Sequence, residues 1–194
     1  MAERDYLTIV SGLPRSGTSM MMKMVEAGGI PVIVDNIRGA DDDNPKGYYE
    51  FEPVKKTKED ASWVEGSAGK CVKMVYRLLY DMPSTHKYRV LFMRRHLDEV
   101  IKSQQVMLER SGKKGGDLGD DQFKMLFRKE TDKCLKWIAD QPDIECIEVS
   151  YNDLLANALP LISQVNQFLG GDLNEEAMAG VVDPSLWRNR SQSR

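Results

Sequence analysis

Short apolar runs alternate with longer, helix-length segments along most of the chain. We expect five of these runs to form strands, over residues 6–10, 30–34, 72–76, 89–93 and 144–149. Alternation of short strands with helical segments is typical of a parallel sheet covered by helices. The pattern therefore predicts an α/β fold with three layers (α/β/α) around a central, mainly parallel sheet.

The segments between these runs show the spacing of amphipathic helices. We expect helices over residues 16–27, 97–110, 123–138 and 154–169. The last of these contains Pro160, which interrupts helical hydrogen bonding, so we expect two helices there. Residues 35–52 and 111–121 are rich in glycine and charge and are predicted to be loops.

Length and composition place limits on the kind of protein. A chain of 194 residues with 41% hydrophobic and 29% charged residues is predicted to form one soluble domain over residues 1–194. Its net charge of −3 favours neither nucleic acid nor an anionic membrane as partner. We find no apolar stretch that could span a bilayer and no signal peptide. Together with three cysteines that lack metal-ligand spacing, expected as reduced thiols in or near the core, this predicts a cytoplasmic protein.

The most informative motif joins the first strand to the first helix. It reads Gly12-Leu13-Pro14-Arg15-Ser16-Gly17-Thr18-Ser19. Backbone N–H groups of such a loop converge on one point, and the helix dipole adds positive charge there, so the loop is suited to a phosphate. The spacing nearly fits the P-loop, G-x-x-x-x-G-K-[ST], and predicts a fold like that of the P-loop nucleoside triphosphate hydrolases. Thr18 replaces the P-loop lysine, which disfavours an ordinary ATPase or GTPase.

Residues 14–19 resemble the motif Pro-[Arg/Lys]-Ser-Gly-Thr-[Thr/Ser] of the sulfotransferases that use 3'-phosphoadenosine-5'-phosphosulfate. The resemblance implies that this nucleotide is the sulfuryl donor and that no metal is required. It also implies that Arg15 lies near the oxygen that bridges the 5'-phosphate and the sulfuryl group. The residues implied to bind the donor's 5'-phosphate are Pro14, Arg15, Ser16, Gly17, Thr18 and Ser19.

A second stretch shows a weaker resemblance to the same family. Its members have an arginine after a strand and a serine eight residues later, which together bind the donor's 3'-phosphate. Arg95 and Ser103 have this spacing, although Leu97 stands where the family usually has proline, and Arg94 is an alternative to Arg95. Arg188 and Arg190 fall where the family has a C-terminal segment that closes over the donor's 3'-phosphate. A disordered basic tail is an equally good interpretation of these residues.

The proton acceptor is less well defined by the sequence. Many members of the family use a histidine on the third strand, but residues 72–76 contain Lys73 and no histidine. Residues 44–50, Asn-Pro-Lys-Gly-Tyr-Tyr-Glu, resemble a stretch of smaller bacterial members, which makes Glu50 the first candidate base and Glu52 the second. A surface carboxylate remains an alternative interpretation of Glu50. Lys73 is expected to neutralise charge on the leaving group.

The sequence as a whole predicts a sulfotransferase that acts on a hydroxyl or amine of a small molecule or glycan. One alternative is a Mg-dependent nucleotide kinase or other phosphotransferase, in which Asp35 binds the metal through water. The other is a nucleotide-binding protein without catalytic activity. Trp63 and Trp187 are assigned either to the core or to the wall of a ligand pocket.

Overall fold

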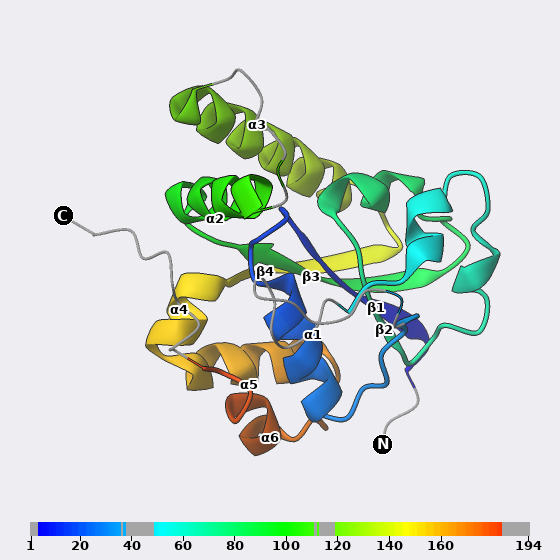
Figure 1. The fold of residues 1–194 in the computed structure, drawn as a ribbon. Coiled ribbons are helices and arrows are strands. Elements are labelled where there is room, and N and C mark those ends of the chain that lie inside the picture. Colours follow the sequence, from blue (N-terminus) through cyan, green and yellow to red (C-terminus); the bar gives the residue numbers. More distant parts are fainter. Residues whose placement is uncertain (1–3, 36, 38–48, 111, 113–118, 184–194) are drawn as a thin grey trace.

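Four parallel strands form the central layer of the protein, in the order β2-β1-β3-β4 (Figure 1). A computed structural model describes residues 4–35, 37, 49–110, 112 and 119–183. The strands are β1 (Tyr6–Gly12), β2 (Cys71–Lys73), β3 (Lys87–Arg94) and β4 (Ile144–Ser150). The parallel sheet that the sequence predicts is therefore confirmed.

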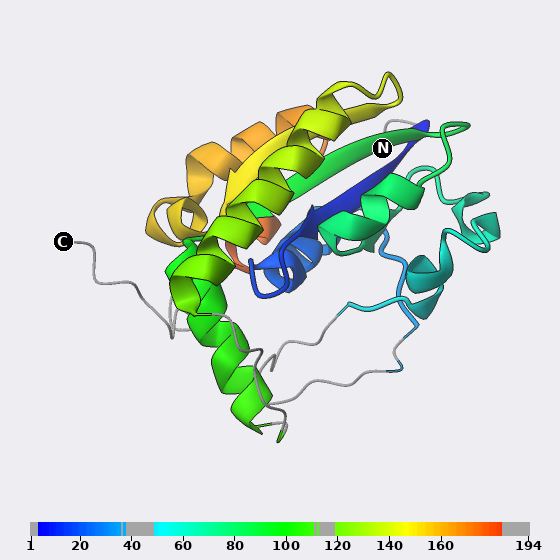
Figure 2. The ribbon, with the colours of Figure 1, turned by 90° about the horizontal axis from the view of Figure 1, so that it is seen from above.

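Helices cover both faces of this sheet (Figures 1 and 2). One face packs against α1 (Thr18–Ala27), α4 (Tyr151–Ala156), α5 (Ala158–Phe168) and α6 (Glu175–Ala179). The other face packs against α2 (Leu97–Arg110), α3 (Asp120–Ala139) and three short 3-10 helices, η1 (Glu52–Lys56), η2 (Ser62–Val64) and η3 (Tyr76–Asp81). The three-layer α/β/α architecture is thus confirmed. Among the residues that the structure describes, no helix has both the length and the apolar character needed to cross a bilayer.

The central strands are mostly apolar in their middle parts because both of their faces are buried there. On β3, Leu91 and Met93 pack towards α1 and α5, whereas Val90 and Phe92 pack towards α3 and η3. All four of these side chains are at most 1% exposed. Alternate residues therefore contribute to two hydrophobic cores, one in each interlayer space.

The strand order determines where a ligand site can form. From β1 the chain first builds β2 on one side and then crosses to build β3 on the other. The carboxyl ends of β1 and β3 are neighbours in the sheet. The connections that follow these two strands leave the sheet in different directions. Open α/β sheets bind their ligands in the crevice at such a switch point. Here it lies between the loop after Gly12 and the turn after Arg94.

The predicted strand over residues 30–34 is wrong. Only Val32 forms a bridge, to Cys71, and the flanking bonds run from Cys71 N to the Pro31 carbonyl and from Ile33 N to the Cys71 carbonyl, each at 2.8 Å. Because Pro31 has no N–H group, it cannot extend the ladder towards α1. The neighbouring strand β2 is also shorter than predicted, since η3 begins at Tyr76.

The other helix boundaries differ from prediction in informative ways. The C-terminal helical segment is indeed two helices, but the break lies at Asn157 and not at Pro160. Pro160 occupies the first turn of α5, where an N–H group has no helical partner in any case. Helix α1 begins at Thr18 and not at Ser16, because Ser16 and Gly17 belong to the loop. The short helix α6 was not predicted.

The three cysteines lie in or near the core, as the sequence predicts. Cys71 and Cys134 are buried, Cys146 is partly buried, and all three are free thiols. Burial raises the pKa of Cys134 to about 11 and that of Cys146 to about 12. These thiols are therefore protonated near neutral pH and have little nucleophilic character.

The packing of two cores predicts that truncating a leucine on the central strand costs much more stability than truncating a leucine on the surface. Replacing the fully buried Leu91 by alanine should lower the free energy of unfolding by about 3 kcal/mol, because the lost methyl groups leave a cavity. Leu159, which is 64% exposed, is the matched control, and its replacement by alanine should cost less than about 0.5 kcal/mol. Urea denaturation of the two variants gives this comparison, and equal losses would contradict the burial pattern.

Candidate active site

The loop from Gly12 to Gly17 is tightly wound at the end of β1. Three of its residues have positive φ angles: Gly12 at 145°, Arg15 at 70° and Gly17 at 97°. A Cβ atom on Gly12 would lie 2.7 Å from the Met93 carbonyl oxygen, and one on Gly17 would lie 2.3 Å from a ring carbon of Tyr151. Both glycines are therefore needed, because the loop backbone packs directly against β3 and α4.

The loop leads directly into the amino terminus of α1. Ser16 is buried, and its hydroxyl and N–H groups both donate to the Leu13 carbonyl, at 2.7 and 3.2 Å. The first helical bond of α1 runs from Met21 N to the Gly17 carbonyl at 3.1 Å. The N–H groups of the residues before Met21 have no partner within the helix, so they and the helix dipole favour an anion here.

Arg15 and Ser103 meet at this loop although they are 88 residues apart in sequence. The Arg15 Nε donates to the Ser103 hydroxyl at 2.9 Å. Ser103 lies on α2 and is only 4% exposed. Two residues that the sequence analysis assigned to different phosphates of the donor are thus direct neighbours.

Arg95 connects the loop to α2 and α4. Its Nη1 donates to the Arg15 carbonyl oxygen at 3.0 Å, and its Nε donates to Glu99 at 2.9 Å. The guanidinium lies over the ring of Tyr151, 4.6 Å from the ring centroid. With its side chain only 8% exposed, Arg95 is largely removed from water. A guanidinium has five N–H donors, so donors on its terminal nitrogens remain for a ligand.

Glu99 supplies the negative charge that this buried arginine requires. Its side chain is 0% exposed, and its second oxygen accepts a hydrogen bond from the Asn152 amide at 3.1 Å. The Asn152 carbonyl oxygen in turn accepts the His96 N–H at 3.1 Å, at the start of α2. We call Asn152, Glu99, Arg95 and the Arg15 carbonyl the loop-anchoring network. Sequence reasoning did not identify Glu99 or Asn152, although Arg95 and Glu99 have the i, i+4 spacing of a helical ion pair.

Lys73 contributes a cation from the other neighbour of β1. It is the last residue of β2, and its Nζ lies 3.5 Å from the Ser19 hydroxyl in the first turn of α1. The loop and α1 therefore lie between Lys73 on one side and Arg95 on the other, as the strand order requires.

Asp35 anchors the segment that contains the candidate bases. Its carboxylate accepts hydrogen bonds from Ile37 N at 3.0 Å and Glu52 N at 2.6 Å, and its own N–H donates to the Glu50 carbonyl at 3.1 Å. These contacts, chiefly that from Glu52 N, lower the pKa of Asp35. Glu52 forms an ion pair with Lys55 at 2.5 Å, which raises the pKa of Lys55. Glu50 is half-buried, and its role as base stays a prediction.

Other residues singled out in the sequence lie away from the loop or outside the described residues. Arg94 points away from Arg95, with its Nε 3.3 Å from Glu148 and its Nη1 3.7 Å from Asp132. Trp63 is partly buried and packs against the core, where it lies edge-on to Phe51 and donates to the Thr57 hydroxyl. The remaining candidates lie outside the described residues: residues 44–48, Trp187, Arg188 and Arg190.

Comparison with solved structures identifies similar folds. The sulfotransferase domain of the curacin biosynthetic pathway superimposes with a TM-score of 0.57 at 16% identity, over 94% of this chain and 79% of that domain. Retinol dehydratase, solved in complex with androsterone and the inactive cofactor PAP, gives a TM-score of 0.50 at 18% identity, over 97% of this chain and 66% of that protein. A sugar kinase from Janibacter sp. HTCC2649 gives a TM-score of only 0.39.

No protein-family model and no curated protein sequence matches the chain. At these low identities, the structural similarity shows a sulfotransferase-like α/β fold and leaves the chemistry to be argued from the residues.

The loop-anchoring network predicts a specific dependence of stability on Glu99. Glu99→Gln should lower the free energy of unfolding by about 3 kcal/mol, because it leaves the Arg95 guanidinium buried without a counter-charge. The control is Glu109→Gln on the exposed side of α2, which should cost less than about 0.5 kcal/mol. Urea denaturation measures both, and a Glu99→Gln variant as stable as the control would contradict the network.

Proposed function

We propose that this protein is a sulfotransferase that moves a sulfuryl group from 3'-phosphoadenosine-5'-phosphosulfate to a hydroxyl or amine of a small-molecule or glycan acceptor. The observation that supports it best is the convergence of four separate segments on one loop. Arg15, Lys73, Arg95 and Ser103 come from the loop, β2, the turn after β3 and α2, and all lie around the start of α1. The fold and the PAP bound to retinol dehydratase are consistent with this proposal.

In this proposal the loop binds the 5'-phosphate of the donor. Within the loop of residues 14–19, Gly17, Thr18 and Ser19 offer backbone N–H groups at the positive end of the α1 dipole, and Thr18 and Ser19 also offer hydroxyls. Arg95 and Ser103 would bind the 3'-phosphate, for which Arg95 has donors beyond those bonded to Glu99 and the Arg15 carbonyl. Arg188 is proposed as an additional ligand of that phosphate.

The reaction would be an in-line displacement at sulfur. The acceptor oxygen or nitrogen forms a bond to sulfur while the bond from sulfur to the bridging oxygen breaks, and the electron pair stays on the 5'-phosphate. Arg15 and Lys73 would stabilise the negative charge that develops on that oxygen, as preorganised cations do at other transferring groups. The proton of the acceptor would pass to the Glu50 carboxylate.

The position of Asp35 weakens the alternative of a Mg-dependent kinase. Both carboxylate oxygens of Asp35 accept backbone N–H groups that close the segment before η1. A carboxylate used in this way stabilises loop structure. The loop also lacks the lysine with which P-loop kinases stabilise the transferred phosphoryl group.

The proposal predicts that Arg15 acts on the transition state. Arg15→Ala should lower kcat by at least about a hundredfold, the usual loss when one donor to developing charge is removed. Transfer of radioactive sulfate from the labelled donor to a panel of hydroxyl and amine acceptors measures this rate. Lys23 lies on the same helix as Ser19, is only partly buried and has no proposed role, so it gives the control variant Lys23→Ala, which should retain activity. An unchanged rate in Arg15→Ala would overturn the role of Arg15.

A second variant tests the base separately from the donor site. Glu50→Gln should abolish turnover while leaving the affinity for 3'-phosphoadenosine-5'-phosphate unchanged, because the amide cannot accept the acceptor's proton. Glu52→Gln is the comparison, and it should retain turnover if Glu50 is the base. Full activity in Glu50→Gln would remove Glu50 from the mechanism.

A further inference from the structure

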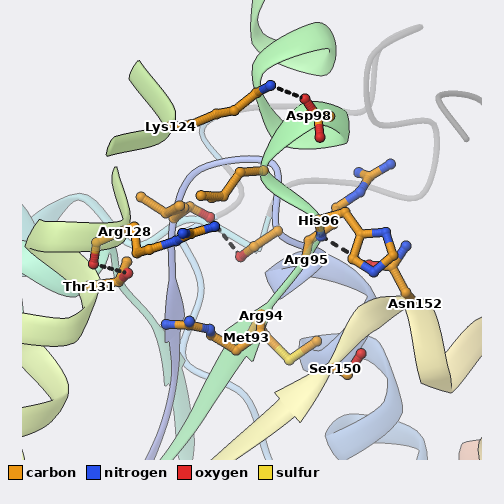
Figure 3. Close-up of a pocket in the computed structure, with 13 residues that line it drawn as sticks. Met93, Arg94, Arg95, His96, Asp98, Lys124, Arg128, Thr131, Ser150 and Asn152 are labelled. Atoms are coloured by element: carbon orange, nitrogen blue, oxygen red, sulfur yellow. Dashed lines mark hydrogen bonds and ion pairs between the residues drawn. The ribbon is translucent and has the colours of Figure 1, made fainter. Parts of the chain in front are cut away.

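A second group of cations lines a pocket between α3 and the carboxyl ends of β3 and β4 (Figure 3). The pocket has a volume of about 480 Å³, within the usual range for small-molecule sites. Four of its lining residues have permanent positive charges and one is a carboxylate: Arg94, Arg95, Lys124, Arg128 and Asp98. The chemistry of the wall therefore favours an anionic ligand.

Arg128 is the cation whose charge is not balanced by a carboxylate. Lys124 forms ion pairs with Asp98 at 2.5 Å and Asp121 at 3.3 Å, and Arg95 is paired with Glu99. Within the described ranges, the Arg128 guanidinium has no hydrogen-bond or ion-pair partner. Figure 3 shows its side chain extending from α3 into the pocket.

Arg94 extends into the pocket from the opposite side and has unused donors. Its contacts with Glu148 and Asp132, at 3.3 and 3.7 Å, balance its charge but are not hydrogen bonds. Its Nη1 is buried and has no acceptor among the described residues. In Figure 3 the side chains of Arg94 and Arg128 point across the pocket from β3 and α3. Two guanidinium groups from facing elements form a site suited to a carboxylate, sulfate or phosphate.

We propose that this pocket binds an anionic group of the acceptor, so that the acceptors are molecules that bear a carboxylate, sulfate or phosphate beside the reacting group. This inference rests on the proposed sulfotransferase function. Leu13 and Ser16 of the loop line the same pocket, which places an anion there next to the donor site. Arg15, Ser103 and Lys73 do not line it, whereas Ser16 and Arg95 do, so the pocket adjoins the residues proposed to bind the donor and extends beyond them to Arg94 and Arg128.

The test is a titration with sodium sulfate, at constant ionic strength, of protein saturated with 3'-phosphoadenosine-5'-phosphate. Nuclear magnetic resonance of the arginine Nε–H groups should show shifts of Arg94 and Arg128 on sulfate binding. Arg128→Ala should weaken sulfate binding about tenfold, the effect of losing one charge-assisted hydrogen bond. Lys129→Ala, an equally exposed cation on α3 outside the pocket, is the matched control and should bind sulfate like the wild type.

Either of the next two results would overturn the proposal. Sulfate affinity unchanged in both Arg128→Ala and Arg94→Gln means that the pocket is not an anion site. If Arg128→Ala instead weakens binding of 3'-phosphoadenosine-5'-phosphate, or if that nucleotide prevents sulfate from binding, then the pocket is part of the donor site. If the wild type fails to bind the nucleotide at all, the proposed function fails. The same titration of the free protein then shows separately whether Arg128 binds an anion.

Discussion

The structure around the candidate site depends on how one buried cation is neutralised. Arg95 is bonded to Glu99, lies over Tyr151 and donates to the Arg15 carbonyl, so it joins α2, α4 and the loop after β1. Removing one partner of a buried ion pair costs about 3–5 kcal/mol, which is a large share of the stability of a domain of this size. The conformation of the loop therefore depends on Glu99 as well as on the residues of the loop itself.

This constraint has a consequence for function. Arg15 occupies a left-handed backbone conformation that is unfavourable for a residue with a side chain, and the bond from Arg95 to its carbonyl stabilises that conformation. The side chain of Arg15 is thereby directed to Ser103 at the switch point of the sheet. In the proposed reaction, a preorganised cation at this position would avoid reorganisation, which is the main way in which fixed charges stabilise a transition state.

The sequence predicts local features well and contacts between distant segments poorly. The buried strands, the glycine-containing loop and the two C-terminal helices follow from local pattern and were confirmed. The strand over residues 30–34 was wrong because Pro31 limits pairing, and the break at Asn157 was missed because Pro160 is tolerated in a first helical turn. Glu99 and Asn152 could not be assigned to the site, since only the folded chain brings Asn152 to Glu99 and the Arg15 carbonyl to Arg95.

The central claim is that the loop of residues 14–19, together with Arg95 and Ser103, binds a 3',5'-bisphosphate nucleotide, and ligand-dependent thermal unfolding tests it most directly. 3'-Phosphoadenosine-5'-phosphate should raise the unfolding temperature, whereas ADP and ATP with Mg²⁺ should not. At a hundred times its dissociation constant, a ligand of the native state adds about 2.7 kcal/mol of stability, which is readily measured. Stabilisation by Mg-ATP alone would contradict the account and would make Asp35 the residue to examine next.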